Sequence, residues 1–139
     1  MIRFPSKCRV YEFIDGRSLG IAGEWIKEIT QDRDLLARFH QKIDLLEQNG
    51  TDLPPSLLTG TRFKNIDKLR IFGKKTTWRV MICKDLLNNK FEFTILYIAQ
   101  EKDRKLIPKD ADSRANDNRN EILSNPLRRQ IYEQNNRKT

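Results

Sequence analysis

The apolar run from Phe91 to Ala99 constrains the fold of this 139-residue chain more than any other segment. The run is rich in β-branched and aromatic residues, which are typical of strands. It is far shorter than the roughly 20 residues that a helix needs to span a membrane. A strand that is apolar along almost its whole length is typical of the interior of a sheet. The run therefore predicts a strand with a central place in a β-sheet.

Two segments upstream predict the neighbouring strands. Lys68–Phe72 and Thr76–Cys83 both alternate between side chains of different character, and a Gly-Lys-Lys turn separates them. Asn88-Asn89 is a plausible hairpin turn between the second of these strands and the apolar run, because Asn tolerates positive φ. These short connections indicate a mostly antiparallel sheet.

The first half of the chain predicts one strand and two helices. Arg9–Asp15 has the composition of a strand, and Ser18 is a candidate cap for a helix that reaches Ile29. From Asp32 to Leu46, apolar residues recur at spacings of three and four, which is typical of a helix packed on a core. Pro108 is a plausible start for a third helix.

The expected fold class is α+β. Two N-terminal helices pack on one face of a small, mostly antiparallel sheet, and a C-terminal helix follows. The residues between the last strand and the third helix, Gln100 to Lys105, are expected to form a charged loop. One domain over residues 1–125 is expected, and residues 126–139 are expected to form a polar, basic tail or a short helix.

The positive charge of the chain is concentrated in its second half. The whole chain carries a formal net charge of +8. Residues 1–60 hold 8 basic and 9 acidic side chains, whereas residues 61–139 hold 19 basic and 10 acidic ones. Such a basic segment favours a polyanionic partner, which includes nucleic acid, an acidic protein and an anionic membrane surface.

Several classes of protein and of site are disfavoured. The sequence has no apolar run long enough for a membrane span and no secretory signal is expected, so a cytoplasmic protein without a membrane partner is the simplest reading. Cys8 and Cys83 form no metal-binding pair and no disulfide framework. His40 is the single histidine, which excludes a multi-histidine metal site, and it is expected to belong to the scaffold. No metal or cofactor is expected.

Scattered cations of the second half are expected to meet on the sheet. Guanidinium groups suit phosphate because their planar fork bonds two oxygens at once. Phe72 or Tyr97 could stack on bases beside them. Alternating charges on a strand are also typical of a solvated sheet face, so both interpretations stand. The candidate cations are Lys64, Lys68, Arg70, Arg79, Lys102, Arg104 and Lys105.

The sequence resembles the RelE/HigB superfamily of bacterial toxins, with the phage-associated, HigB-like branch closest. The resemblance covers roughly residues 9–123 and rests on the order of the elements and on short motifs. These motifs are Leu69-Arg70-Ile71-Phe72-Gly73, Trp78-Arg79-Val80, Ile95-Leu96-Tyr97-Ile98-Ala99, then Lys102 and Pro108. The chain departs from the family pattern after the last strand, where it has no histidine and where Glu101 and Asp103 interrupt the basic segment.

The resemblance implies the toxin of a type II toxin–antitoxin system. Such a toxin is a metal-independent endoribonuclease that cuts mRNA, usually on the ribosome, and a cognate antitoxin binds it. The RNA 2′-OH attacks the adjacent phosphate. We expect Arg79 and Arg70 to stabilise the phosphate, and Lys68 and Lys102 are the candidate proton-transfer groups. Lys64, Arg104 and Lys105 are the expected RNA-binding residues.

Three other functions remain open from the sequence. One is a ParE-like toxin with the same fold that inhibits DNA gyrase and cuts nothing. Another is a nucleic-acid-binding module without enzymatic activity. The third is a basic domain that binds only an acidic protein.

Overall fold

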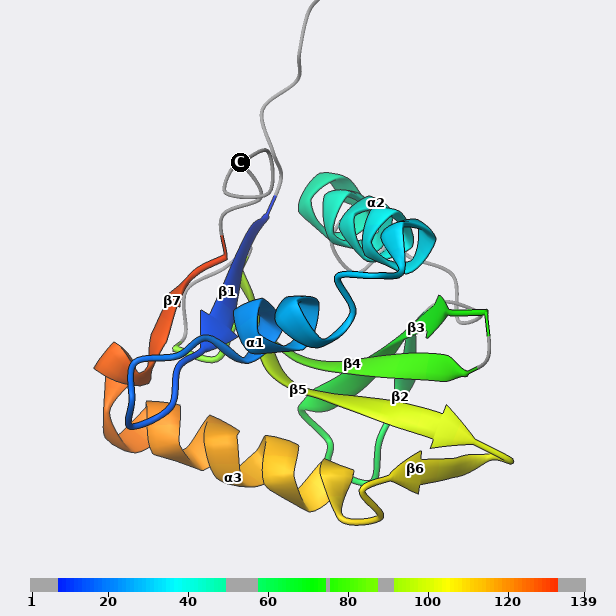
Figure 1. Cartoon of the computed structure of the whole chain (residues 1–139). Helices are drawn as coiled ribbons and strands as arrows, with labels where there is room; N and C mark the ends of the chain where they lie inside the picture. The colour runs from blue at the N-terminus through cyan, green and yellow to red at the C-terminus, as the bar shows by residue number, and fades with distance from the viewer. Residues whose placement is uncertain (1–7, 50–57, 75, 88–91, 133–139) are drawn as a thin grey trace, which may run out of the picture.

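The computed structural model describes residues 8–49, 58–74, 76–87 and 92–132. Within them the chain forms an α+β fold with three α-helices and seven strands (Figure 1). The helices are α1 Ile21–Glu28, α2 Arg33–Asn49 and α3 Ala111–Ser124. The strands are β1 Arg9–Phe13, β2 Leu58–Gly60, β3 Ile66–Phe72, β4 Thr77–Lys84, β5 Glu92–Lys102, β6 Lys105–Ile107 and β7 Arg129–Ile131.

Strand β5 lies inside the sheet, as its apolar run predicts. The strand order is β2-β3-β4-β5-β1-β7, and β6 also pairs with β5. Among the described strands only β1 and β5 pair in parallel, so a mostly antiparallel sheet is confirmed. The sheet is larger than expected, with seven strands. The Asn88-Asn89 turn lies outside the described residues.

Helices cover both faces of the sheet: the two N-terminal helices pack on one face, as expected, but α3 covers the other face, so the helices are not confined to one side. In Figure 1, α1 and α2 lie on one side of the sheet and α3 lies on the other. The reason is that the inner strands bury apolar side chains in both directions. On β4, Val80 and Ile82 join the core under α1 and α2, whereas Met81 and Cys83 join the core under α3.

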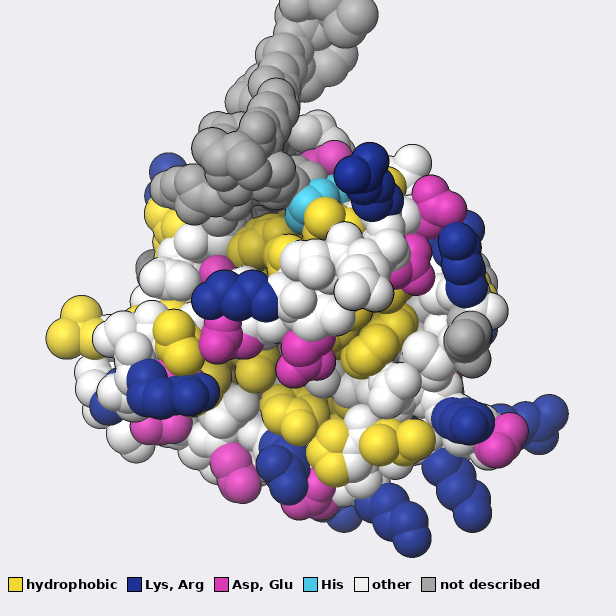
Figure 2. All heavy atoms as spheres, viewed as in Figure 1, with side chains coloured by type: hydrophobic (Ala, Val, Ile, Leu, Met, Phe, Trp, Pro, Cys, Tyr) yellow, Lys and Arg dark blue, Asp and Glu magenta, His cyan; other side chains and the backbone are white. Residues whose placement is uncertain are grey.

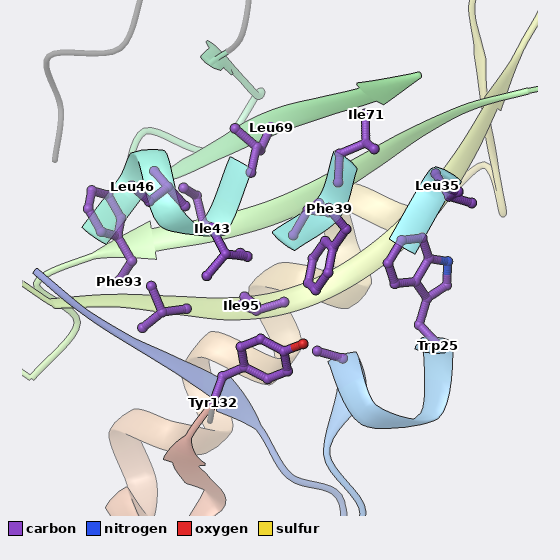
Figure 3. Close-up of a cluster of buried hydrophobic side chains, with 14 of the residues drawn as sticks. Trp25, Leu35, Phe39, Ile43, Leu46, Leu69, Ile71, Phe93, Ile95 and Tyr132 are labelled. Atoms are coloured by element: carbon purple, nitrogen blue, oxygen red, sulfur yellow. The ribbon is translucent and has the colours of Figure 1, made fainter. Parts of the chain in front are cut away.

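The larger core lies between α2 and the sheet (Figure 3). The helical stripe predicted from the sequence is buried there, because its spacing of three and four residues places it on one side of α2. His40 belongs to the scaffold, since its Nε2 lies 3.0 Å from the hydroxyl of Tyr132, which itself lies in this core. The buried residues of the stripe are Leu35, Phe39, Ile43 and Leu46.

A hairpin replaces the charged loop expected at Gln100 to Lys105. β5 continues to Lys102, and β6 begins at Lys105 and pairs back onto it. The two residues between the strands, Asp103 and Arg104, have φ values of 53° and 65°. Positive φ at both central positions is the geometry of a tight two-residue hairpin turn. The turn could not be predicted from the sequence, because its two positions with positive φ are Asp103 and Arg104 and not glycine.

The C-terminal segment is built into the sheet. The sequence predicts a tail or short helix over residues 126–139, but Pro126–Arg128 form a 3₁₀ turn and β7 then pairs with β1. The backbone N–H of Tyr132 also donates to the carbonyl of Val10 at 2.9 Å. Residues 133–139 lie outside the described part of the chain.

The first helix is capped by a buried carboxylate on β1 and not by Ser18, which has a φ of 63° and lies before α1. Glu12 is only 5% exposed, and its Oε1 accepts hydrogen bonds from the backbone N–H groups of Ala22 at 3.0 Å and Gly23 at 3.2 Å. Burial raises the pKa of Glu12, and these hydrogen bonds oppose the rise. The second helix follows the sequence prediction, since Asp32 Oδ1 accepts from the N–H of Leu35 at 3.0 Å.

Replacing Glu12 by Gln should increase stability at neutral pH, because Gln keeps an acceptor for the two N–H groups without a buried charge. The pKa of Glu12 is raised in the folded state. The contribution of Glu12 to the free energy of unfolding is therefore fully present below the ordinary glutamate pKa of about 4.5. This contribution is lost as the pH rises through the pKa of Glu12 in the folded state. Melting temperatures of wild type and Glu12→Gln should agree at about pH 4 and separate by about pH 7. A wild type that melts above the variant at pH 7 contradicts this prediction.

Gly20 should be intolerant of a side chain, and Gly16 offers a matched control. A Cβ at Gly20 would lie 2.0 Å from Glu12 Oε1, which is held by its bonds to the helix, whereas a Cβ at Gly16 would meet no atom within 4 Å. Gly20→Ala should lower the free energy of unfolding by about 1–3 kcal/mol by breaking these bonds. Gly16→Ala should change it by less than about 0.5 kcal/mol. Urea unfolding measures both, and equal losses would show that Glu12 does not set the difference.

Candidate functional site

Three of the predicted cations lie together on the sheet face that α3 partly covers. Arg70 on β3 is directly opposite Arg79 on β4. Lys68 lies two residues before Arg70 on β3, so its side chain is on the same face of the sheet. Their neighbours Leu69, Ile71 and Val80 are buried on the other face, under α2. The alternation predicted from the sequence therefore brings Lys68, Arg70 and Arg79 together, and we call them the cation cluster.

Glu101 is the carboxylate that faces the cation cluster. It lies on β5 opposite Thr77, and its Oε2 accepts a hydrogen bond from Arg79 Nε at 2.6 Å. The side chains of Arg79 and Glu101 are 7% and 20% exposed. The Arg79 hydrogen bond lowers the pKa of Glu101, and the charges of Arg79, Arg70 and Lys68 lower it further. Glu101 is therefore ionised at neutral pH and orients the guanidinium of Arg79.

The cation cluster retains unused hydrogen-bond donors. Arg79 Nη1 and Arg70 Nε are shielded from solvent and have no hydrogen-bond partner among the described residues. Like charges directly opposite each other on a sheet destabilise it, and a buried donor without an acceptor costs about 1–3 kcal/mol. One carboxylate faces three cations, so an anion with several oxygen atoms would relieve both costs. Phosphate has this chemistry.

An exposed aromatic ring lies beside the cation cluster. Phe72 ends β3 and is 53% exposed, and the guanidinium carbon of Arg70 lies 5.7 Å from the centre of its ring. An exposed ring next to phosphate-binding groups suits an unstacked nucleotide base. Tyr97, the other ring predicted to stack on bases, lies on β5 opposite Met81 and packs against the core under α3.

The remaining predicted cations do not join the cation cluster. Lys102 follows Glu101 on β5, so strand alternation directs it to the opposite face, together with its hairpin partner Lys105. Arg104 occupies the exposed turn, and Lys64 lies exposed in the loop between β2 and β3. Figure 2 shows Lys and Arg side chains gathered at the end of the molecule where β5 and β6 lie.

Glu101 is the site residue that sequence reasoning misses. It is visible in the sequence only as an acid that interrupts a basic segment. Once β5 is known to extend beyond Ala99, which pairs with Arg79, the alternation places Glu101 on the same face as Arg79. The missing signal was therefore the length of the strand.

The Cys83 thiol is buried on β4 under α3. Burial raises the pKa of the Cys83 thiol, which is 1% exposed. In the described part of the chain no group of three or more His, Cys, Asp or Glu side chains could hold a metal ion. None of the described helices combines the length and the apolar composition that a membrane span requires.

Comparison of the chain with protein-family models, with curated proteins and with solved structures finds no match.

Removing the Glu101 carboxylate should destabilise the protein, because this carboxylate orients Arg79. Glu101→Ala leaves Arg79 Nε without its acceptor and should lower the free energy of unfolding by about 1–3 kcal/mol, whereas Glu101→Gln keeps an acceptor oxygen and should lose less. Because the pKa of Glu101 is lowered in the folded state, the ionic contribution is present above the ordinary glutamate pKa and is lost as the pH falls through the folded pKa. Denaturant unfolding of both variants between about pH 3 and pH 7 measures this. Equal stability of wild type and Glu101→Ala at pH 7 contradicts it.

Proposed function

We propose that this protein is an endoribonuclease toxin that cuts mRNA through attack of the RNA 2′-OH on the adjacent phosphate. The observation that carries the proposal is the pair of opposed arginines, Arg70 and Arg79, whose shielded N–H donors lack partners in the described chain. The exposed ring of Phe72 beside them suits a nucleotide base. The order of elements also supports the proposal, because two helices lie between the first strand and an antiparallel run of strands, as the resemblance to RelE/HigB toxins implies.

The substrate supplies its own nucleophile in this reaction, so the protein has to position the RNA and stabilise charge. Negative charge builds on the phosphate oxygens as the 2′-oxygen attacks. Arg79, held at its Nε by Glu101, would present its other nitrogens to these oxygens, and Arg70 would neutralise charge from the facing strand. A guanidinium fixed in advance loses less entropy when it binds a phosphate.

Proton transfer falls to Lys68 in this proposal, because it is the remaining member of the cation cluster. Glu101 is a weak base, since its pKa is lowered by Arg79. Lys102 lies on the other face, so we assign it to RNA contacts together with Lys64, Arg104 and Lys105. A cognate antitoxin with acidic groups over the cation cluster would silence the toxin.

Binding of nucleic acid without cleavage is the second candidate. The observation that favours it is the close contact between Arg79 and Glu101, which leaves Lys68 as the titratable base of the cation cluster. This candidate predicts RNA binding that weakens steeply with salt and leaves the RNA intact.

Arg79→Ala should abolish most of the cleavage. We expect inducible expression of wild type to stop growth and to create new 5′ ends in cellular mRNA, mapped by primer extension. Loss of an electrostatic stabiliser of the transition state should reduce cleavage by about 100-fold or more. Arg33→Ala is the matched control, because it removes an exposed cation from α2, on the other face of the sheet. Arg70→Ala tests the same site at a less buried position.

Binding and cleavage experiments on purified protein distinguish the candidate functions. RNA with 2′-O-methyl groups should bind and resist cleavage, because its nucleophile is blocked. Inorganic phosphate should raise the melting temperature of wild type and of Arg33→Ala but not of Arg79→Ala. Salt-sensitive binding of unmodified RNA without products supports the binding module, and inhibition of gyrase supercoiling supports a ParE-like toxin. Cleavage by folded Arg79→Ala at the wild-type rate refutes the assignment of Arg79.

A further inference from the structure

A gap in the pairing of β5 leaves part of its edge without a neighbouring strand. β4 occupies one edge of β5, and β1 pairs with the other edge up to Ile95. β6 pairs with that same edge only from Gln100 onward. Residues 96–99 therefore have no strand partner on this edge in the described structure, although Asn118 Nδ2 of α3 donates to the Leu96 carbonyl at 2.8 Å.

A cleft of about 280 Å³ opens at this gap, between α1 and the β5–β6 hairpin. Figure 2 shows hydrophobic side chains gathered in this region with acidic side chains beside them. The lining includes Trp78 and Gln100, which lie opposite each other on β4 and β5 and on the other sheet face from Arg79. The cleft is thus separate from the cation cluster.

The lining of the cleft is aromatic and acidic. Trp25 and Trp78, whose ring centroids lie 5.4 Å apart, form the aromatic part, whereas the Tyr97 ring packs against the core under α3. The charged side chains that line the cleft are both carboxylates, Glu24 and Glu28 of α1. Lys27 pairs with Glu24 at 2.9 Å, whereas Glu28 has no ion-pair partner among the described residues. A local negative charge is unusual in a chain of net charge +8.

We propose that this cleft binds an arginine side chain of a partner polypeptide. A guanidinium stacks on indole rings and forms charge-assisted hydrogen bonds with carboxylates, so it matches both halves of the lining. The half-buried Trp78 ring would contact the guanidinium and its apolar stem, and Glu28 would neutralise it. The partner chain would run alongside the unpaired stretch of β5, where a strand can add to a sheet edge through its backbone.

The charge of the molecule argues for this occupant. A second copy of the chain carries the same net charge of +8, so the two copies would repel each other outside the cleft. An acidic or nucleic-acid partner would be repelled by the carboxylates of the cleft but attracted to the cation cluster. A basic side chain on a separate polypeptide has the charge that the carboxylates of the cleft complement. The proposal is independent of the ribonuclease activity.

Tryptophan fluorescence reports directly on the cleft, because the chain has two tryptophans and both line it. The probe is the blocked tripeptide N-acetyl-Val-Arg-Val-amide, compared with the same peptide carrying citrulline, which has the shape of arginine without its charge. We expect a saturable change in emission with the arginine peptide, with a Kd of about 1 mM, and binding at least about fivefold weaker with the citrulline peptide.

Two variants make the test specific. Glu28→Gln removes the unpaired carboxylate and should weaken binding of the arginine peptide about fivefold or more. Glu121→Gln on α3 is the control for the same substitution away from the cleft and should leave binding unchanged. Arg79→Ala should also bind the peptide as wild type does, whatever its effect on RNA.

Three results would overturn the proposal. These are equal binding of the two peptides, no loss of binding in Glu28→Gln, and no saturable change up to about 20 mM arginine peptide, well above the expected Kd. A fluorescence change that depends on protein concentration without peptide, together with dimers in sedimentation, would assign the cleft to a second copy of this chain instead.

Discussion

The position of β5 inside the sheet is the constraint on which the rest of the structure depends. Its residues pair with β4 on one edge and with β1 and β6 on the other. Its side chains supply both apolar cores, with Phe93 and Ile95 facing α2 and with Leu96 and Ala99 facing α3. Burial on both faces of a strand requires a layer on each side, so the three-layer arrangement follows from this one segment. Arg79 of the cation cluster lies on β4, which pairs with β5, and Glu101, which orients Arg79, lies on β5 itself. The aromatic cleft opens at the edge of β5.

The sequence predicted the parts of the fold that depend on periodicity. The stripe on α2, the alternation of β3 and β4, and the central place of β5 all follow from spacings of apolar side chains. It failed where contacts distant in sequence decide the structure. The cap of α1 comes from Glu12 on a strand, and the final strand β7 is polar, so neither leaves a local signal. The sequence of β4 alone also does not predict that Met81 and Cys83 are buried under α3.

The candidate site follows the same division. Arg70 and Arg79 could be placed together because each alternates with core residues on paired strands. The faces of Glu101 and Lys102 do not follow from the sequence unless β5 is known to continue past Ala99. Adjacent residues of a strand point to opposite faces, so only one of these two side chains can lie beside Arg79. A shift of one position therefore exchanges a cation for a carboxylate beside Arg79. The cleft combines residues of α1, β4, β5 and β6, so no local sequence motif predicts it.

The pairing of β1 has a consequence for synthesis of the chain. β1 is made first, yet its two neighbours are β5 at residues 92–95 and β7 at residues 129–131. Glu12, which caps α1, lies on β1, and β1 can take its place only after most of the chain has left the ribosome. Contacts of such long sequence separation slow folding, because a large loop must close before they form. The sheet of a protein with this topology is complete only after β7 has been synthesised, so a partner that recognises the folded sheet can bind only after that point.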